Sequence, residues 1–348
     1  MRPIERVASL VLAAGFWLAT FLLFTAPAMA SPLFNSDEVI HITISGPFGS
    51  LLEEKPKKEY LPFVLDGDES GQTLKVRLRG HSRIRVCEFP PLRLNFPADV
   101  DQQSVFAGQD KLKLVTHCRN YDRGEQDMLE EYAAYRVLNL LTELSYRVRL
   151  LNISYDDSDG LLPEDAKKRY GFVIESKQEF EGRTGAQSVS LEGFPKSRHD
   201  LEHAALMYVF QFMIANTDWM MIKADYDEAC CHNLDLFEID SRVFLVPFDF
   251  DLAGVVNARY AYPDPQLRIK SVKQRLYRGL CTDSAYLAEA LRTVNSRRGE
   301  ILAIVWEIPG LETKNRERAA EFLEGFFEKA ENEDRLLASF ERRCIEGY

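Results

Sequence analysis

The sequence predicts an α+β protein with a strand-rich first lobe and a mostly helical second lobe. Short alternations of apolar and polar residues, typical of half-buried strands, recur up to about residue 174. From residue 284 to the carboxyl end, apolar residues instead recur at helical spacing and charged pairs fill the outer positions. This order favours two lobes, 31–175 and 176–348, with a ligand in the cleft between them.

The elements of the first lobe follow from these periods. Residues 128–144 form an amphipathic pattern and predict a helix, and 156–169 reads as a loop. The strand pattern occurs at 38–45, 74–78, 92–96, 112–115, 147–155 and 170–174.

The second lobe begins with a strongly apolar helix, predicted at 201–214. Two short apolar segments, 234–239 and 243–248, predict a hairpin. The rest is predicted to be helical, with one break at Pro309 and Gly310.

Residues 1–30 have the order of a secretory signal peptide. Arg2 and Arg6 precede an apolar run, and small residues at Ala28 and Ala30 precede Ser31. The alternative is a retained membrane anchor, but the small-residue cleavage site favours removal. We therefore expect an exported protein, periplasmic or secreted, that has no membrane contact after cleavage.

The net charge is −11, and it becomes −12 without residues 1–30, which carry two arginines and one glutamate. An acidic protein is a poor partner for nucleic acid, because phosphate binding needs concentrated positive charge. A hydrophobic content of 46% is sufficient for a globular core.

Six cysteines in an exported chain predict structural disulfides, whose connectivity the sequence does not give. We expect the adjacent Cys230 and Cys231 to bond to two different partners rather than to each other. The others are Cys87, Cys118, Cys281 and Cys344.

Polar residues at the ends of apolar segments mark the most informative stretch, 216–251. Asp218 follows the apolar helix, Asn233 opens the next apolar segment, and Asp249 and Asp251 end the second hairpin strand. Phosphoryl transfer from a nucleotide uses such a set: one carboxylate orients the acceptor, while an amide and another carboxylate hold Mg²⁺. Each residue also has a structural interpretation: Asp218 could cap a helix or turn, Asn233 could satisfy loop backbone, and Asp249 and Asp251 could belong to a turn or a structural calcium site.

The first lobe supplies cations that match these acids. Lys113 lies on the polar phase of its strand and could reach nucleotide phosphates, with Glu130 or Glu131 of the next helix as its ion-pair partner. Arg79 and Arg83 flank Gly80 in a basic turn that could cradle phosphates. The alternatives are an exposed strand lysine and an ordinary surface turn.

The order of these segments resembles the spore coat protein H (CotH) kinase family, in a divergent branch. The resemblance extends from about residue 76 to 254. Its most specific blocks are Asn-Thr-Asp-Trp and Val-Pro-Phe-Asp-Phe-Asp. The other matching blocks are R-L-R-G-H-S-R, F-P-P-L-R-L-N-F, K-L-K-L-V-T-H-C, E-E-Y-A-A-Y-R, Y-G-F-V-I-E and H-N-L. It implies a bilobal protein-kinase-like fold that uses ATP and a divalent metal, Mg²⁺ or Mn²⁺.

The resemblance also implies a role for each matching residue. Asp218 would orient the acceptor, Asn233 would bind metal, and Asp249 or Asp251 would be the metal-binding aspartate. Lys113 with Glu131 would anchor the phosphates, and Glu175 would lie near the hinge. The stretch between Asp218 and Asn233 is longer than the matching loop of protein kinases, and Lys111 or Arg93 could take the place of Lys113.

The sequence thus favours an exported kinase that transfers the γ-phosphate of ATP to a protein or small hydroxyl acceptor. The alternatives are a non-catalytic adaptor with a kinase-like scaffold and a metal-dependent phosphoesterase. A serine hydrolase or zinc protease is disfavoured, since Gly-x-Ser-x-Gly and His-Glu-x-x-His are absent from the sequence. His81, His117, His203 and His232 are expected to be surface or packing residues.

Overall fold

The computed structural model describes residues 32–53, 55, 58–67, 71–190, 198–221 and 230–346. The predicted signal peptide, 1–30, lies outside these ranges. Within them, no helix combines the length and the apolar character needed to cross a membrane.

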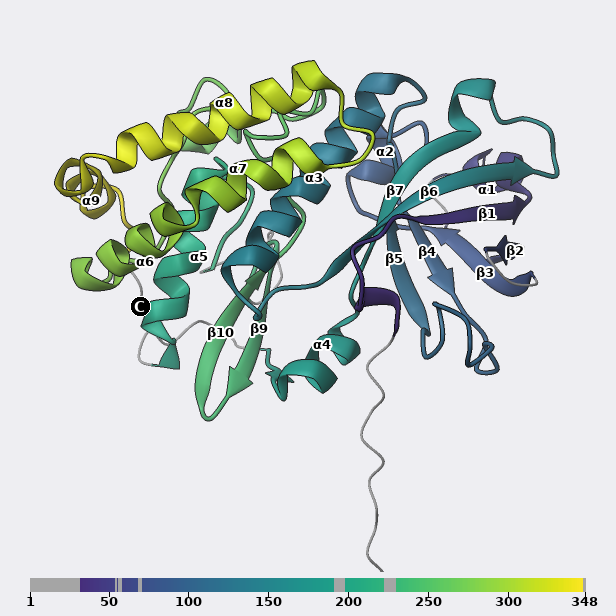
Figure 1. The fold of residues 1–348 in the computed structure, drawn as a ribbon, viewed down its shortest axis with the longest axis horizontal. Helices are drawn as coiled ribbons and strands as arrows, with labels where there is room; N and C mark the ends of the chain where they lie inside the picture. Colours follow the sequence, from purple (N-terminus) through teal and green to yellow (C-terminus); the bar gives the residue numbers. More distant parts are fainter. Residues whose placement is uncertain are drawn as a thin grey trace, which may run out of the picture.

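The first part of the chain forms a closed barrel, at the right of Figure 1, in the strand order β1-β2-β3-β4-β5-β7-β6. The pairing of β1 with β6 is parallel, and the other pairings are antiparallel. The strands are β1 (Ile40–Gly46), β2 (Leu61–Asp66), β3 (Gln72–Leu78), β4 (Leu92–Asn95), β5 (Lys111–Val115), β6 (Val148–Asp157) and β7 (Lys168–Ile174).

The alternating residues of β3, β4 and β5 place apolar side chains inside the barrel and cations outside it. Leucine and valine residues of these strands are buried in one barrel core, as expected where successive side chains point to opposite faces. The outward positions hold Lys75, Arg77, Arg93, Lys111 and Lys113.

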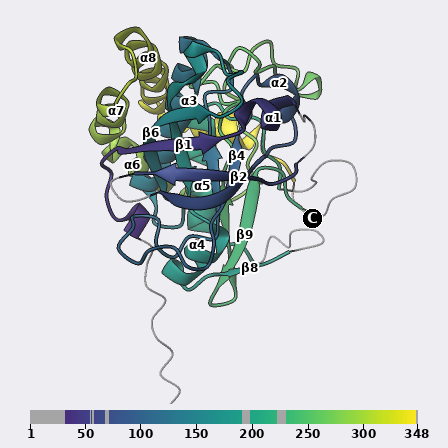
Figure 2. The ribbon, with the colours of Figure 1, turned by 90° about the vertical axis from the view of Figure 1, so that its right-hand side faces the viewer.

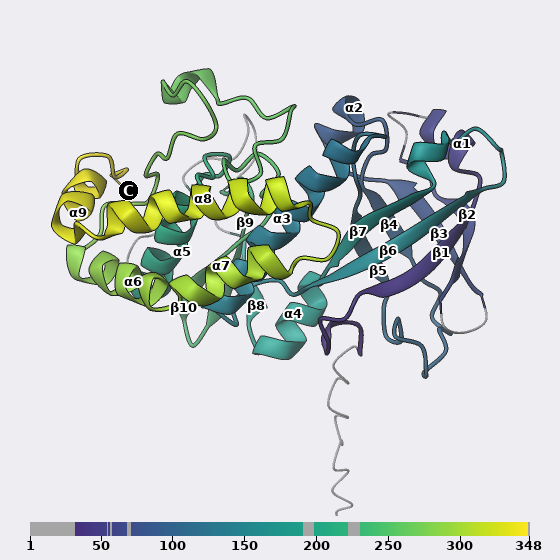
Figure 3. The same ribbon diagram turned by 45° about the horizontal axis from the view of Figure 1, so that its top comes forward.

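Helices make up most of the remainder, at the left of Figure 1. Figure 3 shows α7 and α8 running alongside each other, and α3 lies between them and the barrel in both views. The helices are α1 (Phe48–Glu53), α2 (Arg83–Val86), α3 (Asp122–Leu141), α4 (Lys177–Thr184), α5 (Leu201–Met213), α6 (Ser284–Ser296), α7 (Arg298–Glu307), α8 (Thr313–Ala330) and α9 (Glu333–Glu341).

A small antiparallel sheet of β8 (Gln187–Ser188), β9 (Leu234–Ile239) and β10 (Arg242–Pro247) completes the second half. In Figure 2, which turns the barrel side toward the viewer, β8 and β9 lie below the barrel strands, next to α4. The β9–β10 pair is the predicted hairpin, in register from Leu234↔Pro247 to Ile239↔Arg242.

The predicted α+β class, with a strand-rich first part and a helical second part, is confirmed. The buried residues form two clusters, one inside the barrel and one shared by α3, the later helices, the β9–β10 sheet and residues of β5, β6 and β7. The division at residues 175 and 176 stays a prediction.

Several details differ from the prediction. The carboxyl-terminal helices are interrupted at Arg297 and again near Asn332, in addition to the predicted break at Pro309 and Gly310. Strand β2 and the short helix α4 were not predicted from the sequence.

The disulfides join Cys87 to Cys118, Cys281 to Cys344, and Cys230 to Cys231. The expectation that Cys230 and Cys231 bond to different partners is wrong. The physical reason is that the other four cysteines pair among themselves, so the adjacent thiols have only each other.

Candidate functional site

The β9–β10 hairpin brings two of the predicted site residues together. Asn233 immediately precedes β9 and Asp249 follows β10, and the pairing of Leu234 with Pro247 puts both at the same end of the hairpin. The Phe248 backbone N–H donates to the Asn233 carbonyl at 3.1 Å.

Both residues have left-handed backbone conformations, with φ of 52° at Asn233 and 64° at Asp249. Asn and Asp are the non-glycine residues that tolerate this region best, and such conformations cluster at functional sites. Left-handed backbone at both positions is thus provided by the residue types that tolerate it best.

Asp218 lies beside Asn233, in the loop that follows α5. The Asn233 amide donates to the Asp218 carboxylate at 2.9 Å and to the Asp218 carbonyl at 2.7 Å. The His232 Nε2 lies 3.2 Å from the other carboxylate oxygen. The Asp218 side chain is 35% exposed, so the carboxylate is held in place and is still reachable from solvent.

Arg83 connects the barrel to this region through three carboxylates. Its guanidinium donates two bonds to Glu131 of α3, at 2.9 and 3.0 Å, and its Nε lies 2.9 Å from Asp251. It also pairs with Asp249. The carboxylate oxygens of the three acids lie within 4.8 Å of one another, and the single positive charge of the guanidinium is shared among them.

The two aspartates differ in exposure and in protonation. The Asp251 side chain is 7% exposed, against 44% for Asp249. Burial raises the pKa of Asp251 to about 8; Arg83 opposes this rise, and the charges of Asp249 and Glu131 add to it. Desolvation opposes ionisation of Asp249 too, but Arg83, Arg79 and Lys113 hold its pKa below the ordinary value. Asp249 is therefore the better candidate for a metal-binding carboxylate.

The predicted ion pair between Lys113 and Glu131 is wrong in this structure. Glu131 pairs with Arg83, because the planar guanidinium matches a carboxylate with two parallel bonds. The other candidate, Glu130, pairs with Arg318 of α8. Lys113 instead lies over the rings of Tyr146 and Phe248, 5.7 and 5.4 Å from their centres.

Arg79 and Lys113 both lie near Asp249, since their charges lower its pKa. Burial lowers the pKa of Arg79, although Asp249 counteracts this effect. Burial, followed by the charge of Arg79, lowers the pKa of Lys113 to about 8. The barrel therefore presents cationic groups toward Asp249, as the phosphate-binding interpretation requires.

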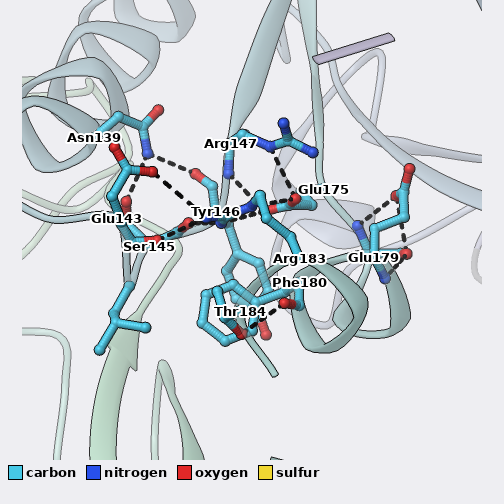
Figure 4. A network of polar contacts seen from close by, with 12 residues as sticks. Asn139, Glu143, Ser145, Tyr146, Arg147, Glu175, Glu179, Phe180, Arg183 and Thr184 are labelled. Atoms are coloured by element: carbon cyan, nitrogen blue, oxygen red, sulfur yellow. Dashed lines mark hydrogen bonds and ion pairs between the residues drawn. The ribbon is translucent and has the colours of Figure 1, made fainter. Parts of the chain in front are cut away.

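Glu175 lies at the connection between β7 and α4, the predicted hinge position. Its carboxylate is fully buried and accepts hydrogen bonds from Arg147 and Arg183, at 2.9 to 3.0 Å. Figure 4 shows both arginines converging on Glu175. Since these two arginines occupy both carboxylate oxygens, Glu175 ties the hinge to β6 and α4, and nucleotide contact by this residue stays a prediction.

Next to the hinge is a cavity of about 610 Å³, between β4, β5 and α4. Lys113, Arg93 and Lys111 line one wall, and residues 176–179 line the other. A larger cavity of about 720 Å³, at the barrel end near Phe63 and Phe96, contains none of the predicted site residues.

Two of the three predicted metal ligands, Asp249 and Asn233, fit a magnesium or manganese ion. Asp249 and Asn233 offer hard oxygen donors at the same end of the hairpin, and Mg²⁺ typically needs one or two protein carboxylates. Asp251, the third predicted ligand, is buried against Arg83 and fits less well.

Sequence reasoning missed three contacts at the site. His232, expected to be a surface or packing residue, contacts Asp218. The Tyr135 hydroxyl accepts from the Asp249 backbone N–H at 2.8 Å, and Arg278 donates to the carbonyl of Thr217. The position of Tyr135 near the site could have been inferred from the sequence, because Tyr135 lies four residues after Glu131 and therefore on the same face of α3.

The lowered pKa of Lys113 predicts a pH effect on stability. An unfolded lysine has a pKa of about 10.4, so above pH 8 the unfolded chain binds more protons than the folded one. Stability of the wild type should therefore rise with pH, relative to Lys113→Met, between about pH 8 and pH 10. Thermal unfolding of the wild type and of Lys113→Met across this pH range measures the difference in their stability.

The matched control is Lys273→Met, because Lys273 is an exposed lysine. We expect Lys113→Met to be the more stable protein at pH 7 and its advantage to shrink toward pH 10. If the stability difference between the wild type and Lys113→Met were constant with pH, or matched that of Lys273→Met, Lys113 would titrate normally.

No family model and no curated protein matches this chain. Among solved structures, it is similar to a proinflammatory kinase of Helicobacter pylori, CtkA. The TM-score is 0.40 with 13% identity, over 72% of this chain and 97% of that chain. At this level of similarity, the role of each residue is judged from its contacts in this chain.

Proposed function

We propose that this chain is an exported, CotH-like phosphotransferase that moves the γ-phosphate of ATP to a hydroxyl group with Mg²⁺ or Mn²⁺. The observation that carries the proposal is the convergence of Asp218, Asn233 and Asp249. They come from three separate points of the chain: Asn233 donates directly to Asp218, and the hairpin register puts Asn233 and Asp249 at the same end of the β9–β10 pair.

Each residue has a role that its contacts support. Asp218 accepts the proton of the acceptor hydroxyl as its oxygen attacks the γ-phosphorus and the bond to the β-phosphate breaks, which leaves ADP. Asn233 orients Asp218 through its amide, and Asn233 and Asp249 offer oxygens to the metal. The bound metal would neutralise phosphate charge.

The barrel cations complete the proposed site. Arg79 and Lys113 lie near enough to Asp249 to lower its pKa and would bind the phosphates. The ion pair of Glu131 is formed with Arg83 of the basic turn, where a phosphate-anchoring pair with Lys113 of β5 was expected. Glu131 of α3 therefore forms an ion pair with Arg83 and not with Lys113.

Export is supported by the signal-type sequence of residues 1–30 and by the disulfides, since disulfides persist in oxidising compartments. The acceptor class is a protein or a small hydroxyl compound, because Asp218 is accessible from solvent.

The test is incubation of the mature protein with γ-labelled ATP, Mg²⁺ or Mn²⁺, and a generic protein acceptor. Label on protein supports the kinase. Release of inorganic phosphate alone would support the phosphoesterase. If neither labelled protein nor inorganic phosphate formed, the adaptor would be supported. The adaptor is considered because the stretch between Asp218 and Asn233 is long.

A further inference from the structure

The stretch 257–278, here called the cationic segment, follows the two aspartates of the candidate site. It contains six cations and one acid, so its net charge is +5, whereas the net charge of the whole chain is −11. In Figure 3 it forms the green loop, with the short helical turn Pro265–Leu267, that projects above α8. The cations are Arg259, Arg268, Lys270, Lys273, Arg275 and Arg278.

Contacts at both ends attach the cationic segment to the site. Near its start, the Tyr260 hydroxyl hydrogen-bonds to the Asp251 carboxylate. At its end, the buried Arg278 donates to the carbonyl of Thr217, the residue before Asp218. The segment therefore leaves the site at one aspartate and returns to it at another.

Close packing also brings the middle of the segment to the loop of Asp218. The Gly254 backbone N–H donates to the Ala215 carbonyl at 3.1 Å. A Cβ atom at Gly254 would come within 2.9 Å of the Lys273 Cα and 2.8 Å of the Ala215 Cβ, so this approach requires glycine. Since Ala215 is three residues before Asp218, Lys273 lies beside the loop that carries the proposed proton acceptor.

Three exposed cations of the segment have no acid to balance them. Within the described ranges, the side chains of Arg268, Lys270 and Lys273 form no ion pair and no hydrogen bond. The one acid of the segment, Asp264, accepts from the backbone N–H of Gln266 at 2.8 Å. Positive charge without a counter-charge is thus exposed next to the site.

An exposed aromatic side chain belongs to the same segment. Tyr262 is 78% exposed. Tyrosine offers a large contact area and is enriched at the centres of protein–protein interfaces. The segment therefore offers a partner both charge and apolar contact.

We propose that the cationic segment binds the acceptor of the phosphotransfer reaction, and that this acceptor is a protein with acidic residues around its hydroxyl group. The inference rests on the proposed function and adds the class of acceptor. An acidic stretch supplies the charge that Arg268, Lys270 and Lys273 lack, and complementary charge sets specificity and association rate. A nucleic acid or an anionic membrane fits less well, because a long polyanion would extend beyond the segment onto a strongly acidic protein.

The test is binding of a short synthetic peptide, with one serine among glutamates, to the mature protein without nucleotide or metal. Fluorescence anisotropy measures the affinity. The triple variant Arg268→Gln, Lys270→Gln, Lys273→Gln should weaken binding at least about fivefold, because three exposed ion pairs each contribute modestly. The matched control removes one arginine and two lysines that are exposed on other elements, and it should bind like the wild type: Arg335→Gln, Lys168→Gln, Lys329→Gln.

Phosphotransfer assays give a second readout. With γ-labelled ATP and Mg²⁺, the triple variant should raise the KM for the acidic peptide at least about fivefold and leave kcat nearly unchanged, because contacts away from the reacting atoms contribute uniform binding. Asp218→Asn should lose label transfer and still bind the peptide. A peptide that binds the wild type but is never labelled would contradict phosphotransfer and leave the acidic partner of the segment in place.

Two results would overturn the acidic acceptor. One is equal affinity of the wild type and the triple variant for the acidic peptide, or equal affinity of the wild type for this peptide and for a peptide with glutamines in place of the glutamates. The other is tighter binding of a single-stranded oligonucleotide, or of anionic phospholipid vesicles, that the triple variant loses.

Discussion

Asp218→Asn should reduce phosphotransfer by about 10² to 10⁴-fold, the usual contribution of a positioned proton acceptor. The amide keeps the size of the side chain and can still contact Asn233 and His232, whose bonds to Asp218 are 2.9 and 3.2 Å long. It cannot accept a proton from the acceptor hydroxyl. Label transfer from ATP, measured at saturating nucleotide, tests the prediction.

The control is Asp99→Asn, because Asp99 is an exposed loop aspartate. The control should keep wild-type activity, and ATP binding by Asp218→Asn should be nearly unchanged. Equal label transfer by the wild type and Asp218→Asn would remove Asp218 from the reaction.

Arg83→Met should lower the free energy of unfolding by about 3 to 5 kcal/mol, the cost of breaking a buried ion pair by removing one partner. The Glu131 and Asp251 side chains are only 2% and 7% exposed. Burial would by itself lower the pKa of Arg83, but Asp249, Asp251 and Glu131 raise it well above its ordinary value. Without the guanidinium, these acids lose their main counter-charge. Urea unfolding at pH 7 measures the effect.

Arg85→Met is the matched control, two residues along the same short helix. Arg85 is exposed and contacts His81 at its surface, so its loss should change stability by less than about 0.5 kcal/mol. If the two variants were equally stable, Arg83 could not be the main counter-charge of the cluster.

The sequence predicted the barrel strands well because their alternation is regular. In β3, β4 and β5, every second residue is leucine or valine up to the strand end, and these residues fill the barrel core. The β9–β10 hairpin was also predicted, with ends that differ by only one residue. In this hairpin the register puts Asn233 and Asp249 at the same end.

The long helix α3 was predicted to begin six residues late, at 128 instead of Asp122. Its first turns hold polar residues, and Gln126, Asp127, Glu130 and Glu131 are buried in it. Periodicity treats charged residues as exposed, so a helix that buries ion pairs has a weak amphipathic signal.

The partner of Glu131 could not be predicted for a related reason. Lys113 and Arg83 are both basic residues before α3, and only the folded barrel shows that the basic turn reaches Glu131. Which cation meets a buried carboxylate depends on three-dimensional distance, and spacing along the chain does not give it.

The central claim is that Asp249 and Asn233 hold a metal ion with which ATP binds, opposite the cations of the barrel. Its most direct test is calorimetric titration of the mature protein with ATP, with and without Mg²⁺, next to Asp249→Asn. We expect Mg²⁺ to tighten ATP binding to the wild type at least about tenfold and to change the variant little. Binding that is equal with and without Mg²⁺ in the wild type would contradict the account.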